Sequence, residues 1–97
     1  MATYIVLMNW TEQGVAEAGD SPNRANAAAS ALRKLGGRMK SVWWTMGPYD
    51  AVSIIEAPDD ETVTAFCLAV GGQGNVRSVT MRAFEKAEMQ TILDRLK

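Results

Sequence analysis

A turn-forming segment near the middle of the chain, Thr45-Met46-Gly47-Pro48-Tyr49-Asp50, constrains the fold more than any other feature. It separates two apolar runs, Met39–Trp44 and Ala51–Ala57, that contain valine, isoleucine and tryptophan, which are favoured in β-strands. Glycine tolerates a positive φ and proline fixes its own φ, so the segment favours a tight bend. The sequence therefore predicts a β-hairpin, with strands over Met39–Thr45 and Ala51–Glu56, at the centre of a small α+β domain.

The first strand is expected at Thr3–Trp10 and is apolar on both of its faces. Alternate side chains of a strand point to opposite faces. One face would carry Tyr4, Val6, Met8 and Trp10, and the other would carry Ile5, Leu7 and Asn9. An antiparallel sheet in a small monomer usually leaves one face in water. We therefore expect both faces of this strand to be covered.

Helices are expected before and after the central hairpin. The first would start at Ser21-Pro22, where serine can cap and proline suits the first turn, and would stop at Gly36-Gly37. The second would be capped by Asp59 and closed by Gly71-Gly72, and Thr11 would cap an additional short turn. Apolar residues recur at helical spacing: Ala25, Ala28, Ala29, Leu32 and Leu35 in the first helix, and Val63, Phe66, Cys67 and Val70 in the second.

A fourth strand is expected at Val76–Phe84, followed by a final helix with an apolar stripe of Met89, Ile92, Leu93 and Leu96. The order β-α-β-β-α-β plus a C-terminal helix is the ferredoxin-like α+β pattern, with a four-stranded antiparallel sheet. Right-handed crossovers would place both main helices on one face of that sheet. The other face would stay open and would carry Tyr4, Val6, Met8 and Trp10, or their alternates, and an apolar face of that size usually marks an interface. Two-fold pairing would cover it, so we expect a homodimer.

Composition limits the classes of protein to which the chain can belong. A length of 97 residues predicts a single domain spanning 1–97. The net charge of −1 gives no general attraction to nucleic acid or anionic lipid. No segment approaches the roughly 20 apolar residues of a membrane span, and the N-terminus carries no basic leader. The single cysteine requires no oxidising compartment, so a cytoplasmic location is expected.

The chain contains no histidine, which excludes histidine-ligated haem, histidine-based zinc and iron sites, and Ser-His-Asp catalysis. One cysteine cannot form a thiolate cage, so neither a metal nor a cofactor is expected. Cys67 falls on an apolar helical stripe, where cysteine usually acts as a small hydrophobe.

The motifs of the chain resemble those of the GYD family, small bacterial proteins within the dimeric α+β barrel class. The resemblance covers Tyr4 to about Leu96. Its motifs are Tyr4-Ile5-Val6-Leu7-Met8, Trp10-Thr11, Gln13-Gly14, Asp20-Ser21-Pro22 with Arg24, Leu35-Gly36-Gly37, the signature Thr45–Asp50, Glu56–Glu61, Gly74–Arg77 and Arg82–Phe84. Pro48 stands between Gly47 and Tyr49, at a position that varies in the family.

This resemblance implies a ferredoxin-like fold, a sheet-to-sheet dimer and no established activity. Relatives in the wider class include cofactor-free oxygenases, isomerases and ligand-sensing domains, so the fold does not select a function. We expect an oligomeric module that is non-catalytic or binds a small ligand. The alternative is a cofactor-independent oxygenase or isomerase acting on a small aromatic or carbonyl compound. Assembly into a larger ring through the sheet edges is a third hypothesis.

Tyr49 and Asp50 are the candidate catalytic pair. Their functional interpretation is a phenol and a carboxylate at the mouth of a pocket, able to bind a polar ligand or exchange a proton with it. Their structural interpretation, which we favour, is a turn in which aspartate bonds to the local backbone. Met46, in the same segment, joins them as a candidate ligand contact.

The tryptophans and one arginine complete the set of candidate ligand-binding residues. Trp43 and Trp44 are adjacent in a strand and should point to opposite faces, and Trp10 could line a cavity with the one that faces away from the helices. A core or interface role is favoured over stacking on a flat aromatic ligand. Arg77, on the last strand, could bind a carboxylate in bidentate fashion. An ion pair between subunits, or a solvated sheet edge, is the favoured interpretation of Arg77.

Overall fold

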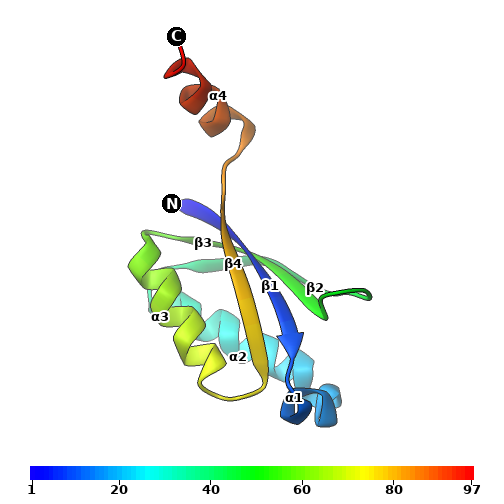
Figure 1. Ribbon diagram of the computed structural model, residues 1–97. Coiled ribbons are helices and arrows are strands. Elements are labelled where there is room, and N and C mark those ends of the chain that lie inside the picture. Colours follow the sequence, from blue (N-terminus) through cyan, green and yellow to red (C-terminus); the bar gives the residue numbers. More distant parts are fainter.

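The computed structural model describes residues 1–97 as a four-stranded antiparallel sheet with helices against one face (Figure 1). The elements are β1 (Ala2–Trp10), α1 (Glu12–Ala16), a 3-10 helix η1 (Ala18–Asp20), α2 (Ser21–Lys34), β2 (Arg38–Trp44), β3 (Ala51–Ala57), α3 (Asp60–Gly71), β4 (Val76–Ala83) and α4 (Lys86–Asp94). The predicted β-α-β-β-α-β order with an extra C-terminal helix is confirmed.

The strands lie in the order β2-β3-β1-β4, so β1 is central and β2 and β4 are the edges. β1 pairs antiparallel with both neighbours: Tyr4 lies opposite Ile55 of β3 and Arg82 of β4. Figure 1 shows α2 and α3 on the same face of this sheet. No helix of the chain is long and apolar enough to cross a membrane.

The core lies between the sheet and the two main helices. The sheet contributes Tyr4, Val6, Ile55 and Ala57, α2 contributes Leu32, and α3 contributes Val63 and Phe66. Leu32 and Ile55 have no solvent exposure. The residue set Tyr4, Val6, Met8 and Trp10 of β1 therefore faces the helices, and Ile5 and Leu7 face away.

Two of the three predicted helix starts are confirmed. The hydroxyl of Thr11 accepts from the N–H of Gly14 (3.1 Å) at the start of α1. The carboxylate of Asp59 accepts from the N–H of Thr62 (2.8 Å) and from its hydroxyl (2.6 Å) at the start of α3. These two bonds lower the pKa of Asp59 below its usual value. Local side-chain chemistry thus decides where both helices begin.

The predicted start of α2 is wrong by one residue. Ser21 is the first helical residue, with φ −62° and ψ −33°, and Asp20 occupies the N-cap position. The 3-10 helix ends directly before Ser21, so the backbone is already helical at this residue. Ser21 therefore does not have the extended backbone that a serine cap needs. Its hydroxyl instead accepts a hydrogen bond from the indole Nε1 of Trp44 (3.1 Å).

The predicted hairpin is confirmed, and hydrogen bonds join its turn to the end of β1. The N–H of Thr45 donates to the carbonyl of Asp50 (2.9 Å), and Gly47 adopts a φ of +119°, which glycine tolerates best. The N–H of Asp50 donates to the carbonyl of Met8 (2.9 Å), and the Asp50 carboxylate accepts from the N–H of Trp10 (2.9 Å). Asp50 therefore joins the turn to the end of the central strand.

The C-terminal helix stands away from the rest of the molecule. β4 leads past the end of the sheet, and α4 follows at the far end of the long axis (Figure 1). The overall extents are 52 × 31 × 18 Å, and the radius of gyration is 14.6 Å. A compact chain of this length would have a radius of gyration of about 12.5 Å. The elongation follows from the position of α4.

Candidate functional site

The face of the sheet turned away from α2 and α3 is apolar across all four strands. We call it the open face, formed by Ile5, Leu7, Trp43, Val52, Ile54, Val79 and Met81. Strand register aligns these side chains in two rows. One row is Trp43, Val52, Leu7 and Val79, and the other is Ile54, Ile5 and Met81, with the polar Ser41 opposite Ile54 on β2. The exposed fractions are 52% for Trp43, 51% for Val79 and 43% for Met81. The rows form one continuous apolar patch.

Polar residues border the open face at both ends. At one end, Arg38, Glu56 and Thr3 lie in the next row, and the Arg38 guanidinium pairs with the Glu56 carboxylate at 3.0 Å. At the other end, Asn9 lies opposite Arg77. An apolar centre with a polar rim is the usual anatomy of a protein–protein interface. The open face is therefore the strongest candidate for a functional surface.

On the helix side, a small cavity of about 90 Å³ lies between the sheet and the helices. Trp10 and Trp44 belong to its wall, whose remaining lining is mostly apolar, and Trp43 points to the opposite, open face. Tyr49 and Asp50 do not belong to the wall. The two tryptophans of the wall could contact a small apolar molecule there, without an adjacent acid or base from the turn.

The other predicted site residues are spread over the molecule. Met46 is 99% exposed at the tip of the hairpin. Tyr49 is partly exposed, and its carbonyl accepts a hydrogen bond from the Thr45 hydroxyl (2.7 Å). The Arg77 guanidinium donates to the carbonyls of Gly71 (3.3 Å) and Val76 (3.1 Å), where α3 connects to β4. Among the predicted site residues, one hydrogen bond joins two of them, from the backbone N–H of Trp10 to the Asp50 carboxylate.

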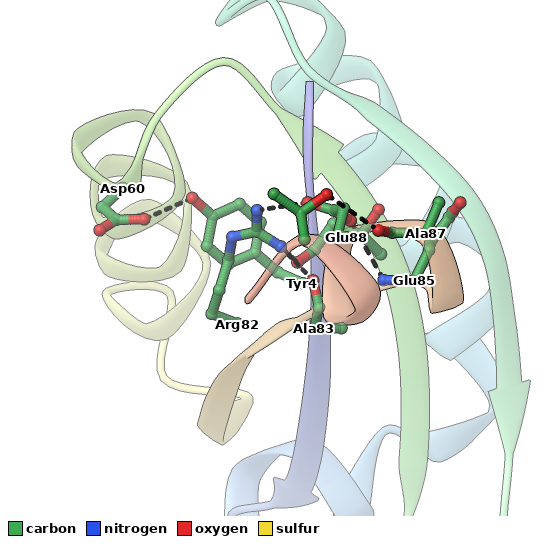
Figure 2. A network of polar contacts seen from close by, with 9 residues as sticks. Tyr4, Asp60, Arg82, Ala83, Glu85, Ala87 and Glu88 are labelled. Carbon is green, nitrogen blue, oxygen red and sulfur yellow. Dashed lines mark hydrogen bonds and ion pairs between the residues drawn. The ribbon is translucent and has the colours of Figure 1, made fainter. Parts of the chain in front are cut away.

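Sequence reasoning missed a polar network beside the start of β1, which Figure 2 shows. The Tyr4 hydroxyl donates to the Asp60 carboxylate on α3. The Arg82 guanidinium lies 5.7 Å from the centre of the Tyr4 ring and 4.5 Å from that of Phe84, both within range of cation–π attraction. It also donates to the Glu88 carboxylate of α4 (3.0 Å). The network joins α3, the sheet and α4.

Two groups in this network have shifted pKa values. The hydrogen bond to the Asp60 carboxylate, with burial of the ring, raises the pKa of the Tyr4 phenol to about 12. The backbone N–H of Glu85 and the Arg82 guanidinium donate to Glu88 and lower the pKa of its carboxyl below the usual value. At neutral pH, Tyr4 is therefore a neutral donor and Glu88 a charged acceptor.

An open cleft of about 530 Å³ runs beside this network, between α3 and β4. Its walls include Tyr4, Asp60, Thr64, Cys67, Ser78, Thr80 and Arg82. The Cys67 thiol lies 3.3 Å from the Thr80 hydroxyl. The charged residues of the wall, Asp60, Arg77 and Arg82, all have hydrogen-bond partners within the chain. The charged groups of the cleft therefore serve the fold, and water can fill the remaining space.

The raised pKa of Tyr4 predicts a loss of stability in alkali. The folded state holds the phenol proton more tightly than the unfolded chain, so this contribution is complete below pH 10 and disappears as the pH rises from 10 to about 12. Tyr4→Phe should cost about 2 kcal/mol at pH 7, because it removes one hydrogen bond to a carboxylate. Urea unfolding at pH 9 and pH 11.5 should show a smaller alkaline loss in the variant than in the wild type. Equal losses in both proteins would contradict the role given to Tyr4.

Comparison with known proteins agrees with the resemblance in the motifs. Residues 4–93 match the family model for the GYD domain. A relative from Thermus thermophilus, named glutamine synthetase and cystathionine beta-lyase binding protein, is 32% identical over 90 residues, which cover 92% of this chain and 95% of the relative. The crystal structure of TTHA0845 from the same organism is 27% identical, covers 88% of this chain and 95% of its own, and aligns with a TM-score of 0.49. This chain belongs to the GYD domain family.

Proposed function

We propose that this protein is a non-catalytic, homodimeric module that binds other proteins. The observation that carries the proposal is the open face, with its two apolar rows between polar borders. Burial of apolar surface contributes roughly 25 cal/mol per Å². A second copy offers the same shape and the same apolar rows, so two-fold pairing satisfies both surfaces at once.

Trp43 is the expected anchor of this pairing. A buried tryptophan removes about 150–250 Å² from water, and tryptophan is enriched among the residues that dominate interface energetics. Its indole is 52% exposed, and Val52 lies directly opposite it in the sheet. In a dimer, the second sheet would cover this half-exposed ring.

The relative from Thermus thermophilus supports protein partners as the class of ligand. Its name assigns it binding to two enzymes, and it aligns over nearly the whole of both chains. We propose the same kind of activity for this chain, which is to bind an enzyme and not to catalyse a reaction itself. The surfaces that a sheet-to-sheet dimer leaves free, including the hairpin tip with Met46, would face such a partner.

The rival hypothesis, a cofactor-independent oxygenase or isomerase, has less support. It requires Tyr49 and Asp50 beside an enclosed apolar pocket. The cavity lined by Trp10 and Trp44 offers the apolar part. The Asp50 carboxylate instead holds the backbone N–H of Trp10.

Light scattering during size-exclusion chromatography measures the molar mass of the 97-residue chain in solution and so tests the proposed dimer. The chain mass is 10.5 kDa, and at about 50 μM we expect twice this value. A mass equal to that of one chain at this concentration would contradict the proposed dimer.

A further inference from the structure

We propose that α4 is an arm that packs against the second copy of the chain. Met89, Ile92 and Leu93 form its contact surface, which we call the arm stripe. The inference rests on the dimer proposed above and extends it, because it gives each subunit a contact outside the open face. Three features of the molecule point to it: the isolation of α4, the exposure of its stripe, and the size of the open face.

The first feature is that α4 is a short helix without a packing partner in its own chain. It has nine residues and stands away from the sheet and from the other helices (Figure 1). Isolated helices shorter than about 12–15 residues are marginal in water, and most helical stability in proteins comes from packing of an apolar face. The body of the chain does not supply that packing. A helix at this position therefore needs an external apolar surface.

The second feature is the amphipathic character of α4. Met89 is 43% exposed and Leu93 is 41% exposed, although both belong to the arm stripe. The other side of the helix is polar: Gln90 donates to the Asp94 carboxylate (3.2 Å), and the Thr91 hydroxyl donates to the carbonyl of Ala87 (3.2 Å). One side of α4 is thus suited to water and the other to burial.

The third feature is the small size of the open face, which indicates that the arm stripe packs against a second copy of the chain. Of the seven open-face side chains, three are exposed and four are half-buried: Trp43, Val79 and Met81 are exposed, and Ile5, Leu7, Val52 and Ile54 are half-buried. Stable protein–protein interfaces bury about 800 Å² per partner. The open face by itself is small for a stable dimer. The missing area must come from a neighbouring apolar surface, and α4 is the next element along the chain.

The path of the chain makes α4 continuous with the open face. Val79 and Met81 of β4 lie in the apolar rows, and Ala83 ends the strand on the same side, three residues before the first residue of α4. An arm of nine helical residues is about 14 Å long. Since α4 lies past the end of its own sheet, it can reach the flank of a second sheet paired with the first.

The direction of the arm is fixed before any partner binds. Arg82 lies against the rings of Tyr4 and Phe84. It also pairs with Glu88 in the first turn of α4 (Figure 2). Glu88 also accepts the backbone N–H of Glu85 (3.1 Å), which caps the helix. A surface held in its bound orientation loses less entropy on association. The polar network therefore acts as the support of the arm.

Two matched variants test the arm in the intact 97-residue chain. Leu93→Glu places a charge in the arm stripe, and Thr91→Glu places the same charge on the polar side. We expect Leu93→Glu to raise the dimer dissociation constant at least about tenfold in sedimentation equilibrium. Thr91→Glu should change it less than about threefold. Equal effects of the two variants would overturn the proposal.

A second measurement separates an arm between subunits from a loss of folding. A spin label at Gln90→Cys, in a Cys67→Ala chain, is mixed with ¹⁵N-labelled wild-type chain, so that broadening of ¹⁵N signals reports only contacts between chains. We expect broadening in the mixed dimers. A wild-type dimer without broadening would overturn the arm and leave the dimer standing. A wild-type monomer would overturn both proposals together.

Discussion

Val79→Arg should convert the protein to a monomer at concentrations at which the wild type has twice the chain mass of 10.5 kDa. Val79 lies on the edge strand β4 at the end of an apolar row, opposite Leu7, and is 51% exposed in the single chain. The added guanidinium can therefore reach water in the monomer, and the fold should tolerate it. In the dimer, each copy would bury a charge without a partner.

The expected effect is large because the two-fold axis repeats the substitution. Burying an unpaired charge costs several kcal/mol, and each dimer would contain two such charges. Since about 1.4 kcal/mol corresponds to a factor of ten, the dissociation constant should rise at least about 100-fold. Light scattering over a dilution series measures this change directly.

Ala65→Arg provides the matched control. Ala65 is exposed on α3, away from the open face, and the substitution adds the same charge. We expect this variant to keep the wild-type mass. If both arginine variants dissociated equally, net charge would be the cause, and the open face would lose its assigned role.

Gly14→Ala should lower the free energy of unfolding by about 3 kcal/mol, because the new methyl group has no room. Gly14 is buried in α1, and a Cβ built there would lie 2.0 Å from the carbonyl oxygen of Asn75. The same contact region holds α1 to the loop before β4, since the N–H of Thr11 donates to that carbonyl (3.1 Å). Relief of the clash must therefore displace α1 or the loop.

Thermal unfolding at equal protein concentration should show this loss as a decrease of more than about 10 °C in Tm. Gly19→Ala is the control, because no atom lies within 4 Å of a Cβ at that position. We expect a change within about 0.5 kcal/mol for the control. A Gly14→Ala protein as stable as the Gly19→Ala protein would contradict the close approach of α1 to the loop.

The order of the elements could be predicted from the sequence because local chemistry decides most of it. Thr11 and Asp59 cap their helices as expected, and Gly47 takes the positive φ that the turn requires. The position of Ser21 inside the helix, with Asp20 at the N-cap, could not be predicted, because it depends on a 3-10 helix just before it. The role of a residue that acts on its immediate neighbours can be predicted from the sequence. The role of a residue that depends on the backbone conformation of the preceding segment cannot.

The arrangement of the candidate surfaces was less accessible from the sequence. Alternation in β1 defines two largely apolar sets but does not decide which set faces the helices, since each contains large hydrophobic side chains. Only the contacts of Tyr4 and Val6 with the core resolve this choice. The network of Tyr4, Asp60 and Arg82 joins residues far apart in the sequence, so no spacing indicates it. Tyr49 and Asp50 carry a motif, and their functional role stays a prediction.

The most direct test of the central claim is an isotope-filtered NOE experiment on the intact protein. Dimers formed from ¹³C-labelled and unlabelled chains would report only contacts between chains. We predict NOEs from the methyl groups of Leu7 and Ile54 in one chain to open-face side chains of the other, including the indole of Trp43. A dimer whose intermolecular NOEs arise from other surfaces, with none from the open face, would contradict the account.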